Sequence, residues 1–189
     1  MKEQKQNGRK GRAYLNDFVV SDDGKYIYQG ITYSFDGDNS SKRRRYAYTA
    51  ILSLIAFIST VVCGCIPAAG MDDCFYVLIP WALEAVSGIF LMVALFRLLF
   101  AKEPRRSYVF AKSAAILPDR AIANAITPAI CIISATVYLI LNGFEDKVWG
   151  SVTYLLLNVV TAVLSYAVYK YARKTEYKKI IPKSQDEEE

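Results

Sequence analysis

One carboxylic acid lies inside a stretch that is otherwise apolar enough to cross a membrane, YVLIPWALEAVSGIFLMVALFRLLF at residues 76–100. Inside a membrane this acid, Glu84, has to be protonated or to face a polar cavity, because an ionised carboxylate is costly in hydrocarbon. If a helix begins near Phe75, Glu84 lies about nine residues in, roughly 14 Å along the helix axis. If Pro80 takes the first helical position, which proline prefers, and Trp81 marks the membrane interface, Glu84 is only one turn inside. The sequence leaves both registers open.

Three polar side chains of the later apolar stretches could meet Glu84. Asn158 falls at the middle of its stretch, and Tyr138 and Tyr154 fall in the outer halves of theirs. A protonated Glu84 that hydrogen-bonds to Asn158 or Tyr154 would form a structural clasp between helices. The same groups could form a cation or proton site, because ionisable groups inside a membrane often mark transport pathways.

The four cysteines offer a second chemistry. Cys63, Cys65 and Cys74 flank one short loop, and Cys131 lies inside a later apolar stretch. In an oxidising compartment Cys74 could form a disulfide with Cys65, or with Cys63. Reduced thiols packed near helix ends fit the pattern equally well. The cysteine spacing is not that of a zinc site, so we expect no metal.

Catalytic machinery has little support in the composition. The chain contains no histidine, which excludes the Ser-His and Cys-His nucleophile pairs. It also has no glycine-rich phosphate-binding loop. We therefore expect no catalytic residue, no cofactor and no enzymatic activity.

The elements that position these residues follow from the hydropathy. The chain has 189 residues, is 53% hydrophobic, and gathers its apolar residues into four blocks of about twenty, the length that spans a bilayer. The sequence therefore predicts an all-α integral membrane protein with a bundle of four transmembrane helices. The predicted helices are Tyr46–Pro67, Tyr76–Phe100, Ile122–Asn142 and Trp149–Tyr169.

The basic residues predict the orientation of these helices. Of the 23 Lys and Arg residues, all but Lys147 lie on the side that holds both termini and the connection between the second and third helices. Positive residues favour the cytoplasmic side, so we expect both termini to be cytoplasmic, in the plasma membrane. Basic residues beside the helix ends would contact anionic lipid headgroups. The predicted anchors are Arg43, Arg44, Arg45, Arg105 and Arg106. No nucleic-acid-binding motif accompanies the charge, so we expect no nucleic-acid partner.

The N-terminal segment has a different pattern. We expect a disordered basic tail at 1–13, a cytoplasmic β-hairpin and linker at 14–45, the transmembrane domain at 46–172 and a cytoplasmic tail at 173–189. Asp23-Gly24 and Gln29-Gly30 are turn signals between short β-prone runs, so residues 14–35 predict a small hairpin or a three-strand meander. Because so few strands are marginal alone in water, we expect them to dock on the helix ends, on lipid or on a partner.

Two functional hypotheses follow. The first is a non-enzymatic accessory or scaffold subunit of a membrane complex, in which the hairpin docks a membrane-protein partner. The second is a small transporter or channel that uses Glu84 and Asn158. A homo-oligomer is compatible with both hypotheses.

Overall fold

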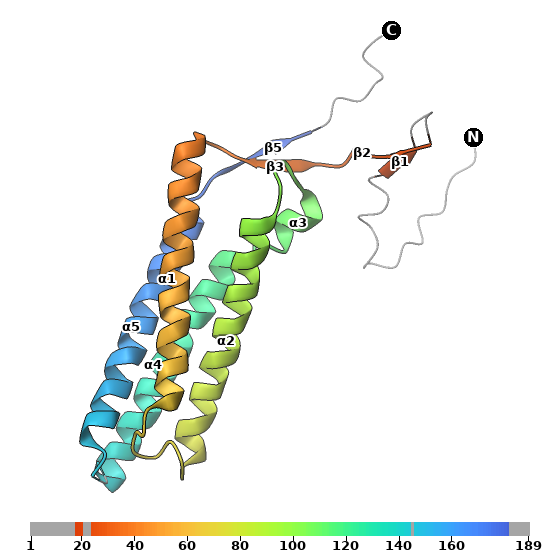
Figure 1. Cartoon of the computed structure of the whole chain (residues 1–189). Helices are drawn as coiled ribbons and strands as arrows, with labels where there is room; N and C mark the ends of the chain where they lie inside the picture. The colour runs from red at the N-terminus through yellow and green to blue at the C-terminus, as the bar shows by residue number, and fades with distance from the viewer. Residues whose placement is uncertain (1–17, 21–23, 145, 182–189) are drawn as a thin grey trace.

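Four long helices form the body of the molecule (Figure 1). The computed structural model describes residues 18–20, 24–144 and 146–181. Within them, four helices are long and apolar enough to cross a membrane. They are α1 Asn39–Cys65, α2 Phe75–Phe100, α4 Leu117–Asn142 and α5 Val148–Arg173. The predicted four-helix composition is therefore confirmed, whereas the predicted membrane insertion and orientation stay predictions.

Helix α1 begins earlier than the apolar pattern predicts. It starts at Asn39 rather than at Tyr46, because the side chain of Asp38 caps it by accepting a hydrogen bond from the backbone N of Ser40 at 3.3 Å. Hydrogen bonds from Ser40 also lower the pKa of Asp38 below its ordinary value. The basic run at 42–45 consequently lies within the first turns of the helix instead of in a linker.

The helices pack as a four-membered bundle in which each helix contacts two neighbours. α1 and α4 each pack between α2 and α5. The residues that line the interior are often small or polar, including Ala56, Thr60, Asn124 and Ser165. Such side chains let helix backbones approach closely, and their hydroxyl and amide groups can bond between helices. The Asn124 Nδ2 donor, for example, lies 2.8 Å from Ser165 Oγ.

A three-stranded sheet covers one end of this bundle, and we call that end the sheet end. Its strands are β3 Thr32–Phe35 at the centre, β4 Arg105–Arg106 on one side and β5 Tyr177–Ile180 on the other. All pairings are antiparallel. The sheet thus joins segments that precede α1, connect α2 to α4 and follow α5. The short helix α3 Ser107–Ala111 follows β4 directly.

This sheet corrects two sequence-based predictions. β3 does not continue the N-terminal strands as a meander: it pairs with β4 and β5 instead. The segment predicted as a tail at 173–189 also contributes to the fold, because its residues 177–180 form β5. Both errors have one physical reason, which is that β-pairing partners distant in sequence leave no local signal.

The N-terminal hairpin does form. β1 Phe18–Val20 pairs antiparallel with β2 Tyr26–Tyr28, and Gly24 at the turn has the positive φ of 74° that glycine accepts readily. In Figure 1 the two strands lie beyond β3, away from the helices. The predicted tail at 1–13, the start of the hairpin at 14–17 and residues 182–189 fall outside the described residues.

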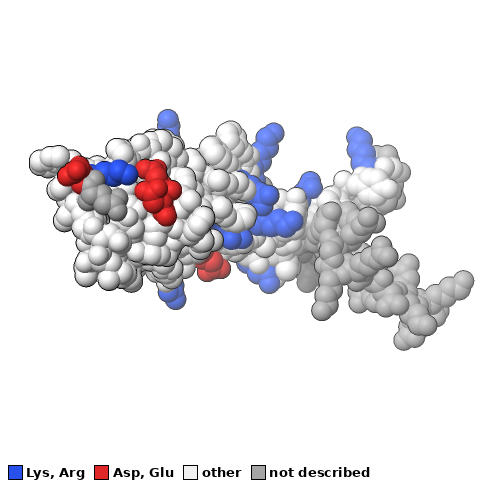
Figure 2. Space-filling view, turned by 90° about the horizontal axis from the view of Figure 1, so that it is seen from below, with Lys and Arg blue, Asp and Glu red and all other residues white. Residues whose placement is uncertain are grey.

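The opposite end of the bundle carries the α1–α2 and α4–α5 loops, and we call it the loop end. Figure 2 views the molecule from this end, where acidic side chains gather around a basic one. Lys147 Nζ lies 3.2 Å from Asp72 Oδ2. The remaining Lys and Arg residues of the described segments belong to the sheet end or to the N-terminal hairpin.

Candidate functional site

The register of α2 decides where Glu84 lies. The helix starts at Phe75 and contains Pro80 in its interior, so the deeper of the two predicted registers is the one that occurs. Glu84 stands nine residues after the helix start, about 14 Å along the axis, and its side chain is 0% exposed. The acid therefore faces the interior of the bundle.

Two helices other than the predicted one supply the partners of Glu84. Thr60 of α1 donates from Oγ1 to Glu84 Oε1 at 2.7 Å. Cys131 of α4 donates from Sγ to Glu84 Oε2 at 3.2 Å. The acid thus links α1, α2 and α4, and none of the ion pairs between described residues includes it. The predicted hydrogen bonds from Asn158 or Tyr154 to Glu84 are not formed.

Asn158 and Tyr154 are nevertheless buried near this cluster. Asn158 Nδ2 donates to the backbone O of Tyr154 at 2.9 Å and lies 3.5 Å from Cys63 Sγ. The Tyr154 hydroxyl and Asn158 Oδ1 are buried without a hydrogen-bond partner among the described residues. These groups form a second layer around Glu84 instead of its direct partners.

Tyr138 belongs to the loop end and not to the Glu84 cluster. It is buried and packs against Gly70, where a Cβ atom would lie 2.8 Å from its ring. Its ring centroid is 6.1 Å from that of Tyr76. Ser151 Oγ accepts the backbone N–H of Ala69 at 3.0 Å nearby. The loop between α1 and α2 is thus packed onto the helix ends and closes the bundle there.

Trp81 lies in the contact between α1 and α2, a position that the sequence does not predict. Its indole packs against Gly64 of α1, and its Nε1 donates to the backbone O of Thr60 at 3.0 Å. It therefore points into the α1–α2 contact, although tryptophan near a helix end usually marks a membrane interface. The same contact fixes the turn of α1 that carries the Glu84 partner.

All four cysteines are free thiols, so the predicted disulfide between Cys65 and Cys74 is not formed. Cys63 and Cys131 are buried in the bundle, while Cys65 is exposed. Within the described segments, no group of three or more His, Cys, Asp or Glu residues could hold a metal ion.

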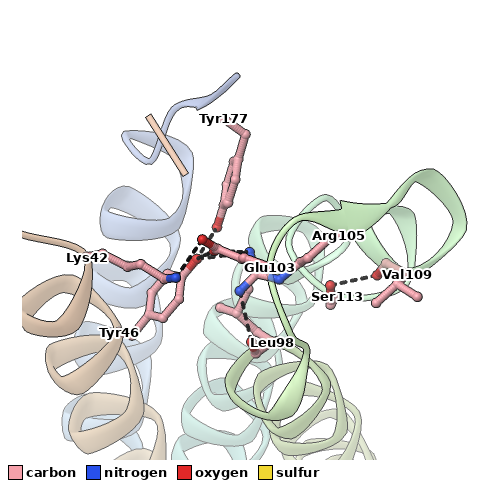
Figure 3. A network of polar contacts seen from close by, with 8 residues as sticks. All are labelled: Lys42, Tyr46, Leu98, Glu103, Arg105, Val109, Ser113 and Tyr177. Carbon is pink, nitrogen blue, oxygen red and sulfur yellow. Dashed lines mark hydrogen bonds and ion pairs between the residues drawn. The ribbon is translucent and has the colours of Figure 1, made fainter. Parts of the chain in front are cut away.

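A second buried polar cluster lies under the sheet (Figure 3). Arg105 is only 2% exposed. Its guanidinium lies 3.2 Å from Glu103 Oε1 and donates to the Tyr46 hydroxyl at 3.0 Å and to the backbone O of Leu98 at 3.2 Å. Lys42 Nζ lies 2.5 Å from the other Glu103 oxygen. Arg105 therefore ties α1 and α2 to the sheet.

Aromatic rings complete this cluster. Tyr177 of β5 lies with its hydroxyl 3.4 Å from that of Tyr46, and its ring is 5.9 Å from the Arg105 guanidinium carbon. Phe35 and Phe110 pack edge-on against Tyr177, with centroids 6.3 and 5.0 Å away. Burial and the hydrogen bond with Tyr46 raise the pKa of the Tyr177 hydroxyl. The sheet end is consequently closed by a packed layer.

This cluster changes the role predicted for Arg105. As a buried cation bonded to Glu103, it cannot contact lipid headgroups. Arg45 donates to the backbone O of Lys174 at 2.8 Å, which links α1 to the end of α5. Arg106 lies over the rings of Phe18 and Tyr28, with distances of 5.1 and 5.2 Å. Arg43 and Arg44 are exposed on α1, as an anchor role requires.

Comparisons with known proteins supply no relative. The chain matches no protein-family model, and no curated protein or solved structure matches it significantly.

Proposed function

We propose that this protein is a non-enzymatic multi-pass membrane protein, an accessory or scaffold subunit whose β1–β2 hairpin engages a membrane-protein partner. The four long apolar helices support the membrane assignment. The concentration of Lys and Arg at the sheet end supports an orientation with both termini cytoplasmic, and we place the protein in the plasma membrane.

The observation that carries this proposal is the hairpin itself. Tyr26 is 76% exposed and Ile27 is 49% exposed, on strands that lie away from the helices (Figure 1). The base of the hairpin is held by Tyr28, whose hydroxyl lies 3.1 Å from the backbone O of Ile31 and 3.2 Å from Ser107 Oγ. A rigid mount that presents an exposed aromatic and free strand edges suits the addition of an extended partner segment.

The closed bundle also supports a scaffold. Glu84 has both oxygens bonded within the interior, which fits a clasp between helices. Layers of packed side chains close both ends. These features favour a rigid body over a conducting path.

The test is photocrosslinking from the hairpin tip. A photoreactive residue at position 26 should crosslink one defined membrane protein in cells, and Tyr26→Ser with Ile27→Ser should abolish co-purification of that protein. Substitution is sharper than deletion of residues 14–35, because deletion removes β3 from the sheet. Tyr171→Ser with Ile181→Ser, also exposed at the sheet end, is the matched control. Equal loss of the partner in the control would contradict the proposal.

A small transporter or channel is the second candidate. The observation that favours it is the pair of buried unpartnered oxygens, Asn158 Oδ1 and Tyr154 Oη, beside the Glu84 cluster. Flux in reconstituted vesicles that disappears in Glu84→Gln would support this function. Flux that is equal in Glu84→Gln, or no flux in the natural protein, would reject it.

A further inference from the structure

A two-part groove lies at the sheet end between α2, α3 and α4. Its first hollow has a volume of about 360 Å³ and its second about 290 Å³, and both are lined by Arg97 and Lys112. Arg120 completes the basic lining of the second hollow, whose remaining wall includes Phe90, Val93 and Ile116. Three cations thus surround a groove with an apolar wall.

These three cations have no acidic partner among the residues that the structure describes. None of the ion pairs between described residues includes Arg97, Lys112 or Arg120. Glu103, the acid of the neighbouring cluster, is taken by Lys42 and Arg105. Unpaired cations around one hollow attract an anion with little competition from the protein itself.

Two of the three cations also lie against aromatic rings. The Arg120 guanidinium carbon lies 4.8 Å from the centroid of Phe90, and Lys112 Nζ lies 5.3 Å from that of Tyr108. A third hollow at this end, lined by Lys42 and Arg43, differs because its Lys42 is already paired with Glu103. The groove of α2, α3 and α4 is therefore the better anion site of the two.

The position of the groove along the helices identifies the class of anion. Arg97 stands three residues before the end of α2 and Arg120 three residues after the start of α4, so both lie about 5 Å from a helix end. Phe90 lies seven residues closer to the middle of α2, about 10 Å deeper. In a spanning bundle, Arg97 thus stands near the headgroup level, and the Arg120 guanidinium reaches the Phe90 ring at the upper end of the apolar wall.

We propose that this groove binds an anionic phospholipid, with its phosphate between Arg97, Lys112 and Arg120 and an acyl chain along Phe90 and Val93. Guanidinium groups match phosphate oxygens in pairs, and basic pockets between membrane helices suit anionic headgroups. The proposal rests on the proposed membrane insertion and is independent of the hairpin's partner.

The test compares lipid retention by the purified full chain. The protein is reconstituted in nanodiscs of phosphatidylcholine with 10 mol% phosphatidylglycerol, extracted in mild detergent and weighed by native mass spectrometry. We expect retained phosphatidylglycerol in the natural protein and a loss of at least about tenfold in R97Q/K112Q/R120Q. The matched control R44Q/K170Q/K178Q removes the same charge from exposed positions at the same end and should retain the lipid within about twofold.

Several outcomes would contradict the proposed lipid site. Equal loss of phosphatidylglycerol in both triple variants would show a general attraction of the basic end to anionic lipid and would reject a specific site. Retention by R97Q/K112Q/R120Q, displacement of the lipid by millimolar inorganic phosphate, or a dimer mass without lipid would each reject a lipid site here. Flotation with pure phosphatidylcholine vesicles separates the two proposals: failure to float contradicts membrane insertion, whereas flotation without selective retention contradicts the groove alone.

Discussion

Trp81 occupies the space into which any side chain at position 64 would project. A Cβ atom on Gly64 would lie 2.0 Å from Trp81 Cζ2, far inside van der Waals contact. The same indole donates its N–H to Thr60, whose hydroxyl bonds to Glu84. The packing of one glycine therefore supports the polar centre of the bundle.

Gly64→Ala should destabilise the bundle, because the rigid indole cannot move away without losing its hydrogen bond. Overpacking of this kind costs about 1–3 kcal/mol. Unfolding in mixed micelles measures the change. Gly88→Ala is the control, since its Cβ would lie 3.1 Å from the Phe57 ring, a much smaller overlap, and should cost less. A smaller loss at position 64 than at position 88 would argue against this contact.

Glu84→Ala should destabilise the protein by about 2–4 kcal/mol, because it leaves a cavity and removes the acceptor of Thr60 and Cys131. Glu84→Gln keeps the shape and one carbonyl acceptor, so its cost should be about 1 kcal/mol or less. Unfolding free energies of the two variants check this order. Asp73→Ala, at an exposed acid of the loop end, should have no measurable effect. Equal stability of Glu84→Ala and the natural protein would contradict the clasp.

Arg105→Met should cost about 3 kcal/mol, because it removes the buried partner of the Leu98 carbonyl and one of the two ion pairs of the half-buried Glu103. The neighbouring exposed residue provides the control: Arg106→Met loses only contacts with rings, worth about 1 kcal/mol or less. Thermal unfolding of both variants, with hydrogen exchange of β3 and β5, measures the effect. Equal losses of stability in Arg105→Met and Arg106→Met would contradict the structural role of Arg105.

The raised pKa of Tyr177 predicts loss of stability in alkali. The folded state holds this proton more tightly than the unfolded state, so the contribution is complete below the ordinary tyrosine pKa of about 10 and declines as the pH rises above it. Tyr177→Phe has no hydroxyl to ionise. Between pH 9 and 11, the Tm of the natural protein should therefore fall more than the Tm of Tyr177→Phe. A difference that stays constant with pH would rule out this linkage.

The proposed orientation predicts which thiol is reached from outside the cell. Cys65 is exposed at the loop end, whereas Cys63 and Cys131 are buried. A membrane-impermeant maleimide on intact cells should label the natural protein, and Cys65→Ser should lose most of this label. In that background, Lys178→Cys at the sheet end should react only after permeabilisation. Labelling of position 178 in intact cells would reverse the proposed topology.

Hydropathy alone was enough to predict the number and approximate bounds of the long helices, because each apolar block is a continuous local signal. The apolar pattern predicts the start of α1 too late, at Tyr46, because the residue that caps the helix, Asp38, lies outside the apolar block. The apolar surroundings of Glu84 mark it as a candidate polar site, but the sequence leaves its depth open, and only the start of α2 at Phe75 places it in the interior. Its partners were not predictable, because Thr60 and Cys131 are unremarkable in their own helices and meet the acid only through packing.

The cluster at the sheet end was not predictable in the same way. In the sequence, Arg105 is one of many basic residues beside helix ends, and nothing local distinguishes it from Arg106. The alternation along β4 turns one inward and the other outward, and that alternation exists only because β3 pairs beside it. The packing of Trp81 leaves no local signal for a related reason, since the glycine that accommodates it lies in a different helix.

The three-stranded sheet also constrains the order in which the molecule can be assembled. Its central strand is synthesised before α1, whereas β5 follows α5. A ribosome delivers the four helices one after another, and each can join the bundle as it emerges. β3 gains its second neighbour only after the fourth helix has left the ribosome. The closure of the sheet end therefore follows the synthesis of α5, and a nascent chain that stops within α5 has its buried arginine layer incomplete.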